Sequence, residues 1–203
     1  MTKPVFISVA FGDHRYLEQL KRLEKSIKDA DTMFWTEDIP GKPFLESLYG
    51  FKVHAVKEAL KKGYTKIIWC DPACVLVGEI DKWFELTKEY GVLAARDSSL
   101  LKDTISDKAL KYYGDPDITG WHLVGGSVYV FEFPYAENIF NHWAKAEEDG
   151  IFGSQHEASY GRINKHRNDE SCMSMALYMN GSKPLEHGEL GYNGYAVMKK
   201  HFR

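Results

Sequence analysis

The sequence has little cysteine and no long apolar segment. Its three cysteines, Cys70, Cys74 and Cys172, are an odd number and follow no disulfide pattern, which favours a reducing compartment. Cys70 and Cys74 are spaced like half of a zinc site, but no second pair follows and Pro72 separates them, so we expect buried free thiols. No apolar run approaches the ~18 residues that cross a membrane, and the amino terminus lacks the apolar length of a signal peptide. These absences predict a cytoplasmic protein with no membrane span, although a truncated chain would look the same.

An excess of positive charge is also absent. The chain has 26 lysines and arginines against 29 acidic residues, a net charge of −3 and a pI near 6.2. Proteins that bind duplex nucleic acid or anionic membranes concentrate basic residues on one face or in one run, and no long basic run occurs here. We therefore expect neither of them as a main partner.

Several catalytic signatures are missing. No Gly-x-Gly-x-x-Gly follows the first expected strand, and no Gly-x-x-x-x-Gly-Lys-Ser/Thr occurs, which excludes the dinucleotide-binding and Walker-type loops. The chain also lacks a Gly-x-Ser-x-Gly elbow and a His-Glu-x-x-His pair. Its chemistry must come from other residues.

The composition is that of an ordinary globular domain. The 203 residues suit one domain with a substantial core, and 44% are hydrophobic and 27% charged. Aromatic residues are abundant, with 12 tyrosines and 5 tryptophans. Aromatic faces stack on bases and on sugar rings, but filling the core is the more general explanation for them.

Strand-like segments alternate with helix-like segments along the chain. The expected strands are 5–10, 32–35, 67–70, 92–95 and 127–133, and the expected helices are 16–28, 51–62, 80–90, 100–113, 134–148 and 168–179. We expect a polar loop at 96–99, a helix that begins at Pro134, a cap at Asn168 and a mostly irregular tail after 181. The alternation predicts an α/β fold with an open, mostly parallel sheet and helices on both faces.

One carboxylate ends the apolar strand expected at 67–70. This segment reads Ile-Ile-Trp-Cys, and Asp71-Pro72 stops it because proline has no N–H for a ladder. Ligands of open α/β sheets bind at the carboxyl ends of strands, which makes Asp71 a candidate binding residue. A turn or a helix cap would explain the same aspartate equally well.

A second polar cluster, at 166–171, reads His-Arg-Asn-Asp-Glu-Ser. Acidic residues favour helix amino ends, and this alone could account for Asp169 and Glu170. His166 and Arg167 are harder to explain as capping. A histidine, an arginine and two carboxylates could pair a general base or nucleophile with a phosphate-binding cation.

Two glycines precede the last expected strand. Gly125 and Gly126 form either a bulge or turn, or a backbone that lies close to a ligand in a pocket lined by Trp121 and His122. Lys52, at the start of an expected helix, is either solvated or placed to bind a phosphate near the strand-end carboxylate.

Taken in order, these segments resemble the glycosyltransferases of the A-type fold (GT-A), which use nucleotide-diphospho-sugars. Residues 49–60, 63–71 and 77–81 follow that family's succession of Phe-Lys, helix, apolar strand, Asp-x-Asp and helix, and 121–133 is similar to the segment that faces the donor sugar. Asn168-Asp-Glu-Ser171 is similar to the His-Asp-Glu-Ser of the blood-group-type retaining transferases and to the His-Arg-His-Asp-Gln-Ser of several bacterial and viral ones. The resemblance covers residues 4–190 or so, and its strength lies in the order of short motifs.

The resemblance implies a single Rossmann-like domain, with a nucleotide-binding part at about 1–95 and a sugar and acceptor part at about 96–203. It implies a hexosyltransferase of polysaccharide biosynthesis with a nucleotide-sugar donor, UDP favoured, and a glycan or other hydroxyl acceptor. Glu170 matches the catalytic carboxylate and Asp169 its neighbour, and Trp121 and His122 would contact the acceptor. The donor-binding residues would be Ala10, Phe11, Tyr16, Lys52, Trp69, Cys70, Asp71, Gly125, Gly126, His166 and Arg167.

The Asp-x-Asp pair that often holds Mn²⁺ or Mg²⁺ in this family is incomplete. Asp71 matches the first aspartate, but Ala73 occupies the second position. Either another ligand joins Asp71, with His187 as the candidate, or the reaction needs no metal and Lys52, His166 or Arg167 neutralises the leaving diphosphate. The likeness to His-Asp-Glu-Ser favours retention of anomeric configuration, but the choice between retention and inversion stays open because Asn168 replaces the histidine.

Two other hypotheses compete with this one. The missing aspartate is compatible with a non-catalytic relative that binds a nucleotide sugar or a glycan. A nucleotidyltransferase on a similar sheet would need a glycine-rich, basic loop after the first strand, and Phe11-Gly-Asp-His14 is a poor match. The short carboxyl-terminal part leaves room for an oligomeric partner or a longer parent chain.

Overall fold

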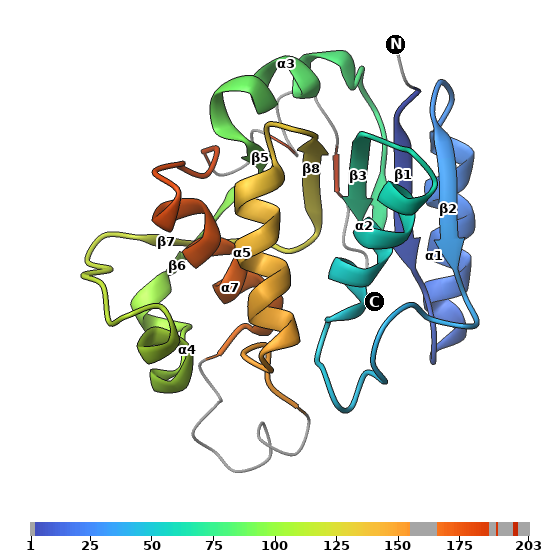
Figure 1. The fold of residues 1–203 in the computed structure, drawn as a ribbon. Coiled ribbons are helices and arrows are strands. Elements are labelled where there is room, and N and C mark those ends of the chain that lie inside the picture. The colour runs from blue at the N-terminus through green and yellow to red at the C-terminus, as the bar shows by residue number, and fades with distance from the viewer. Residues whose placement is uncertain (1–2, 155–165, 187–189, 191–196, 199–203) are drawn as a thin grey trace.

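A five-stranded sheet with the order β2-β1-β3-β8-β5 forms the centre of the protein (Figure 1). The computed structural model describes residues 3–154, 166–186, 190 and 197–198. The strands are β1 (Val5–Val9), β2 (Asp31–Trp35), β3 (Lys66–Cys70), β5 (Val92–Leu93) and β8 (Val128–Glu132). No helix within these residues combines the length and the apolar character that crossing a membrane requires.

The sheet is mostly parallel, as predicted, with one reversed strand. β1 runs parallel to β2 and β3, whereas β8 is antiparallel to both β3 and β5. The reversal places the residues before β8 at the same edge as the residues after β3. The Asp71 amide donates to the Ser127 carbonyl oxygen at 2.8 Å, which joins the two segments at that edge.

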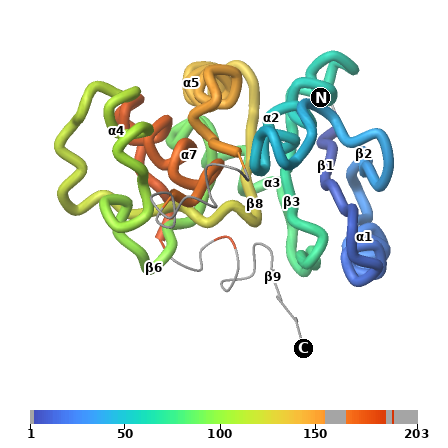
Figure 2. The backbone as a smooth tube through the Cα atoms, turned by 90° about the horizontal axis from the view of Figure 1, so that it is seen from below, coloured from blue at the N-terminus to red at the C-terminus, as the bar shows by residue number. Residues whose placement is uncertain are grey.

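Helices cover both faces of the sheet (Figures 1 and 2). One face packs against α1 (His14–Ser26) and α3 (Asp81–Tyr90), and the other against α2 (Phe51–Lys61) and α5 (Glu137–Glu148). On β3, Ile67 and Trp69 face the α2 side and Ile68 and Cys70 the α1 side, because successive side chains of a strand point in opposite directions. A continuous apolar run is therefore what a strand buried on both faces requires.

The last helix, α7 (Asn168–Met179), packs between α5 and β7 (His122–Val124). The strand β7 pairs with β6 (Arg96–Leu100), and β4 (Cys74–Val75) pairs with β9 (Val197–Met198). The prediction of a polar loop at 96–99 is therefore wrong, because this segment is part of β6. Its polar sequence carries no strand signal, and its extended conformation depends on pairing with β7.

Two helix boundaries also differ from expectation. The segment 100–113 is not one helix: a short 3-10 turn, η1 (Leu101–Asp103), precedes α4 (Asp107–Tyr112), which begins where the Ser106 hydroxyl accepts from the Ala109 amide. Pro134 lies in a turn, and α5 begins only at Glu137.

Asn168 does not cap α7. It is the first residue of that helix, and Arg167 occupies the capping position. The Asn168 side chain instead donates to the Phe152 carbonyl oxygen, which fastens the start of α7 to the segment after α5.

We predict that Gly91, which ends α3, tolerates alanine less well than Gly63, which follows α2. Both have positive φ, 72° and 87°, so alanine costs about 1–2 kcal/mol of backbone strain at either site. A Cβ at Gly91 would also lie 2.7 Å from Ile139 Cδ1, whereas no atom lies within 4 Å at Gly63. Urea denaturation should give a loss of unfolding free energy of about 2–4 kcal/mol for Gly91→Ala. Equal losses for the two variants would show that Ile139 of α5 moves aside with no loss of unfolding free energy.

Candidate active site

The candidate site is built around the ammonium group of Lys52, the second residue of α2. The helix α2 leads directly into β3 and runs antiparallel to it, so its first turn lies at the carboxyl end of β3. Lys52 is 4% exposed and its Nζ donates to Asp169 Oδ2 at 2.7 Å and to the Gly126 carbonyl oxygen at 2.8 Å. Asp71 Oδ1 lies 3.9 Å from the same nitrogen. Three aromatic rings enclose it, each with a centroid within 5.6 Å of Nζ: Tyr49, Trp69 and Tyr129.

The two charges of this buried pair respond differently to their surroundings. Burial alone would lower the pKa of Lys52, but Asp169 and Asp71 outweigh that effect and hold the pKa above its usual value. Burial raises the pKa of the Asp169 carboxyl to about 7, with Lys52 opposing the shift and Glu170 adding to it. Lys52 therefore stays charged at neutral pH, and Asp169 is the partner that takes up a proton as the pH falls.

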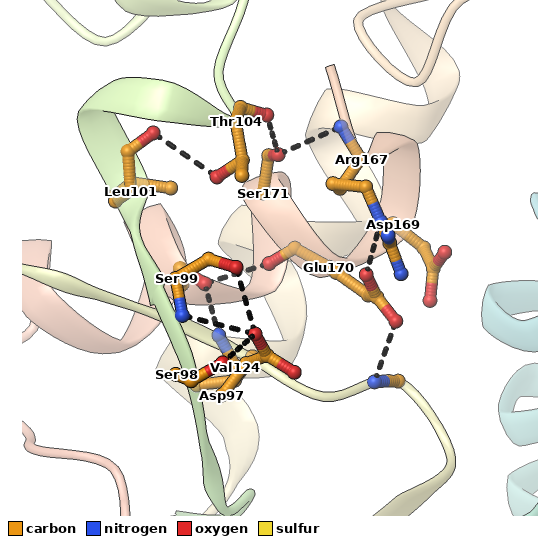
Figure 3. Close-up of polar contacts among 12 residues, drawn as sticks. Asp97, Ser98, Ser99, Leu101, Thr104, Val124, Arg167, Asp169, Glu170 and Ser171 are labelled. Carbon is orange, nitrogen blue, oxygen red and sulfur yellow. Dashed lines mark hydrogen bonds and ion pairs between the residues drawn. The ribbon is translucent and has the colours of Figure 1, made fainter. Parts of the chain in front are cut away.

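Glu170 lies beside Asp169 on α7 and is the more accessible of the two carboxylates. Its side chain is 16% exposed, against 3% for Asp169. Its Oε1 accepts from the Gly126 amide at 3.0 Å and its Oε2 from Arg167 Nε at 2.8 Å (Figure 3). Two donors thus fix the orientation of a carboxylate that keeps contact with solvent.

The first turn of α7 is held in place by the segment after η1. The Ser171 hydroxyl donates to the Thr104 carbonyl oxygen at 2.6 Å and accepts from the Arg167 amide at 3.0 Å (Figure 3). The Trp143 indole of α5 donates to the Asp169 carbonyl oxygen at 3.0 Å. These bonds position Asp169 and Glu170 through backbone, hydroxyl and indole groups that do not themselves carry charge.

Gly126 lies in direct contact with the charged groups. A Cβ at this position would lie 2.8 Å from Lys52 Nζ, 2.9 Å from Glu170 Cγ and 3.0 Å from Asp169 Oδ2. At the neighbouring Gly125, the same atom would meet only the Ala95 carbonyl oxygen, at 3.9 Å. Of the two glycines, Gly126 is the one in close contact, and its neighbours are protein side chains, so the predicted approach of this backbone to a ligand stays a prediction.

A pocket of about 330 Å³ lies beside Lys52 and Asp71. We call it the aromatic pocket, and its lining residues are Val9, Phe11, Tyr16, Phe44, Tyr49, Phe51, Lys52, Trp69, Asp71, Pro72 and Ala73. Five of the predicted donor-binding residues are brought together here, namely Phe11, Tyr16, Lys52, Trp69 and Asp71. The pocket thus combines apolar ring surface with one cation and one carboxylate at its edge.

Sequence reasoning missed the wall of the aromatic pocket formed by Phe44 and Tyr49. These rings belong to the irregular segment between β2 and α2 and meet edge to face with centroids 5.4 Å apart. The buried Glu147 of α5 holds this segment by accepting from the Ser47 hydroxyl at 3.0 Å, and it also bonds to His54 of α2 at 3.1 Å. The available signal was the gathering of aromatic residues at 44–51, in a segment with no apolar periodicity.

Other predicted residues lie away from this pocket. Ala10 is buried, and its amide donates to Trp35 of β2. Cys70 is buried on the α1 side of the sheet.

His166 is buried too. Its Nδ1 accepts from the Ser106 amide at 3.3 Å and its Nε2 donates to the Ile151 carbonyl oxygen at 3.0 Å, so the ring holds neighbouring segments together. Trp121 and His122 line a second pocket.

The described residues do not form a metal site by themselves. They contain no group of three histidine, cysteine, aspartate or glutamate side chains that could hold a metal ion. Asp71, with a side chain 31% exposed at the edge of the aromatic pocket, offers one carboxylate. This donor set fits a Mg²⁺ or Mn²⁺ ion that a phosphate ligand brings with it, because such ions often bind through one carboxylate, substrate phosphates and water. His187 lies outside the described residues, and its role stays a prediction.

We predict that Lys52→Met lowers stability most at alkaline pH. Because Asp169 has a raised pKa in the folded state, folding takes up a proton between about pH 4 and pH 7, and this contribution to the unfolding free energy declines as the pH rises through that window. Removing Lys52 removes the group that opposes the shift, so the decline extends above pH 7. At about pH 8 we expect a loss of about 3–5 kcal/mol by urea denaturation, with a smaller loss at about pH 5.

The double variant Lys52→Met/Asp169→Asn is the control for this prediction. It has no buried carboxylate to leave unpaired, so we expect it to regain stability at the alkaline pH relative to the single variant. An equal loss for the single variant at both pH values would contradict the ionisation of Asp169 as its cause.

We predict that Gly126→Ala disrupts the charged cluster and that Gly125→Ala does not. The new methyl group in Gly126→Ala must displace Lys52, Glu170 or Asp169, and we expect a loss of unfolding free energy of about 2–4 kcal/mol. Gly125→Ala is expected to change it by less than about 1 kcal/mol. Thermal denaturation of both proteins measures the difference, and similar melting temperatures would show that the cluster repacks freely.

Comparisons with known proteins are informative only at the level of structure. No protein-family model matches the chain, and no curated protein matches its sequence. Among solved structures, a glycosyltransferase involved in the glycosylation of the major capsid of PBCV-1 is similar, with 12% identity and a TM-score of 0.55 over 98% of this chain and 96% of the other. The apo structure of the bifunctional glycosyltransferase WbbM is similar too, with 12% identity and a TM-score of 0.54 over 92% of this chain.

The two similar structures differ in how much of their length this chain matches. The chain spans 39% of WbbM but nearly all of the capsid-glycosylating enzyme. At this level of identity the likeness concerns the arrangement of elements alone. The mixed sheet, its flanking helices and these neighbours together show that the chain has the fold of glycosyltransferases.

Proposed function

We propose that the protein is a GT-A glycosyltransferase that moves a hexose from a nucleotide-sugar, UDP-sugar by preference, to a hydroxyl group of a glycan. The observation that carries the proposal is the position of Glu170, Asp169, Lys52 and Asp71 at the ligand-binding edge of the sheet, next to the aromatic pocket. The fold shared with glycosyltransferases supports it.

The aromatic pocket is the proposed site of the nucleotide. Flat ring surfaces such as those of Phe11, Tyr16 and Tyr49 suit a planar base, and Asp71 stands where the diphosphate would leave the pocket. Every residue that lines it precedes residue 95, in agreement with a nucleotide-binding part at about 1–95. The carboxylates of α7 come from the part proposed to handle the sugar and the acceptor.

The electrostatics of the site favour a donor that arrives with a divalent cation. Three carboxylates, Asp71, Asp169 and Glu170, stand against the two cations Lys52 and Arg167. Above about pH 7, where Asp169 ionises, this cluster has a net charge of −1 and would repel a diphosphate. We propose that Asp71 holds Mg²⁺ or Mn²⁺ together with the diphosphate, and that the ion supplies charge neutralisation for the leaving nucleotide.

The two carboxylates of α7 receive different roles in this proposal. Glu170 keeps contact with solvent and is fixed by Gly126 and Arg167, so we assign it to the reacting sugar as the catalytic carboxylate. Asp169 is buried behind Lys52, so we assign it as a positioning residue. In the overall transfer, the bond from the anomeric carbon to the diphosphate oxygen breaks, the bond to the acceptor oxygen forms, and the acceptor hydroxyl loses its proton.

The three cysteines bear on where the reaction takes place. Cys70, Cys74 and Cys172 are all free and buried. Free thiols persist in reducing compartments, so we propose a cytoplasmic enzyme of polysaccharide biosynthesis.

We predict that UDP raises the melting temperature of the protein at millimolar concentration and that Glu170→Gln abolishes sugar transfer without weakening UDP binding. A carboxamide keeps the size of the side chain but loses the charge that the reaction requires. Screening nucleotide sugars and nucleoside diphosphates by thermal shift, followed by release of nucleotide from the best donor, measures both effects. The exposed Glu148 on α5 provides the matched control, since Glu148→Gln is expected to keep full activity.

Two outcomes would contradict this function. If no nucleoside diphosphate or nucleotide sugar shifts the melting temperature, the glycosyltransferase proposal fails. If UDP binds but no donor is ever hydrolysed or transferred, the protein is a non-catalytic nucleotide-sugar binder.

The role of the metal is tested by repeating the UDP titration with Mn²⁺ and with EDTA. We expect UDP to bind more weakly in EDTA, and we expect Mn²⁺ to have no effect on UDP binding by Asp71→Asn.

A further inference from the structure

A second pocket, of about 440 Å³, lies at the carboxyl-terminal end of α7, at the opposite end of the helix from Glu170. Its volume is within the range of small-molecule sites, about 300–1,000 Å³. We call it the α7 pocket, and its lining residues are Arg96, Gly120, Trp121, His122, Tyr178, Gly181, Ser182, Lys183, Pro184 and Glu186. It shares no residue with the aromatic pocket.

An aromatic stack forms one wall of the α7 pocket. The rings of Trp121 and Tyr178 lie nearly parallel, 12° apart, with centroids 4.4 Å from each other. The Tyr178 hydroxyl accepts from the His122 amide at 2.9 Å, and the Trp121 carbonyl oxygen accepts from the Leu101 amide at 2.8 Å. Both rings are partly exposed and line the pocket, so the ring surface that their mutual contact leaves uncovered is an apolar surface that is already ordered before any ligand binds.

A buried polar atom without a partner lies on the same wall. His122 Nδ1 is shielded from solvent and makes no hydrogen bond to any described residue. Such an atom costs free energy in the folded protein, typically about 1–3 kcal/mol, unless a ligand or a water bonds to it. His122 lines the pocket, and turning its ring toward the pocket would bring Nδ1 within reach of a bound hydroxyl group.

The charges of the α7 pocket nearly cancel. Arg96 pairs with Glu186, and Lys183 is the other charged residue of the lining. A near-neutral lining with a guanidinium, a carboxylate and an imidazole suits a ligand rich in hydroxyl groups, because each hydroxyl group can both donate and accept a hydrogen bond. A nucleoside diphosphate would need more positive charge that is not already paired.

We propose that the α7 pocket binds a saccharide, with the apolar C–H face of a sugar ring on the Trp121–Tyr178 stack and its hydroxyl groups on His122 and the Arg96–Glu186 pair. The further assignment as the distal part of a glycan acceptor rests on the proposed function. Tyr178 follows Glu170 by eight residues of α7, a rise of about 12 Å. A short oligosaccharide spans that separation, whereas a single sugar does not.

Direct binding tests this proposal without any donor. Linear tetrasaccharides of glucose, of galactose, of N-acetylglucosamine and of alternating glucose and glucuronate are titrated into the full chain in the absence of nucleotide, with ligand-observed NMR as the measurement. We expect at least one to bind at millimolar concentration or below. Trp121→Leu should weaken that binding about threefold to tenfold, because it removes the stacking surface.

A second variant separates binding from folding. His122→Leu removes an atom that has no hydrogen-bond partner among the described residues, so we expect an unchanged or higher melting temperature together with at least threefold weaker saccharide binding. Tyr135→Ala is the matched control, because this ring is 49% exposed and lies outside both pockets. The UDP-induced thermal shift should be the same in all these proteins.

The outcomes distinguish this proposal from the glycosyltransferase function. Saccharide binding that Trp121→Leu and His122→Leu weaken supports the α7 pocket even if UDP does not bind. Failure of all four tetrasaccharides, equal binding by wild type and Trp121→Leu, or competition by UDP would overturn it. Loss of the UDP shift in Trp121→Leu would instead identify a nucleotide site and would also overturn it.

Discussion

The buried ammonium group of Lys52 is the constraint on which the site depends. Taking a charge out of water costs several kcal/mol unless partners surround it, and here the partners come from three separate parts of the chain. Asp169 belongs to α7, the Gly126 carbonyl oxygen precedes β8, and Asp71 follows β3. Forming the ion pair therefore fixes α2, α7 and two strand ends relative to one another, and it explains why position 126 has no room for a side chain.

The same arrangement gives the two neighbouring carboxylates of α7 different surroundings. Asp169 satisfies Lys52 in the interior, which leaves the adjacent Glu170 free to face outward between two donors. Asp71 stands on the other side of Lys52 at the mouth of the aromatic pocket. A single buried cation thus holds Asp169 and Asp71 at one sheet edge, with Glu170 fixed beside them by Gly126 and Arg167, although the mutual repulsion of the carboxylates would otherwise drive them apart.

The helix α7 runs from the charged cluster beside Lys52 to the α7 pocket. Its first turn carries the charged cluster and its last turn carries Tyr178, which is stacked on Trp121. Its other residues are almost all buried against α5 and β7, so the helix keeps both ends in fixed positions. A rigid element with a polar site at one end and an aromatic surface at the other is well suited to align an extended ligand.

The sequence alone determined the strands and helices that short stretches of residues specify, through an apolar run, a helical spacing or a terminal acidic pair. The apolar run before Asp71-Pro72 specified β3 and its end, the spacing of Val53, Val56 and Ala59 specified α2, and the acidic pair after Arg167 marked the start of α7. From these, the mostly parallel sheet could be predicted, whereas the roles of Asp71, Lys52 and Glu170 rest on the resemblance to GT-A transferases and stay predictions. Only the tertiary structure decided the reversed direction of β8, the extended conformation of β6 and the wall formed by Phe44 and Tyr49. It also decided that Asp169 is buried while Glu170 is not. The reason is that each of these depends on pairing or packing between residues far apart in the chain, and such contacts leave no periodic pattern in either partner.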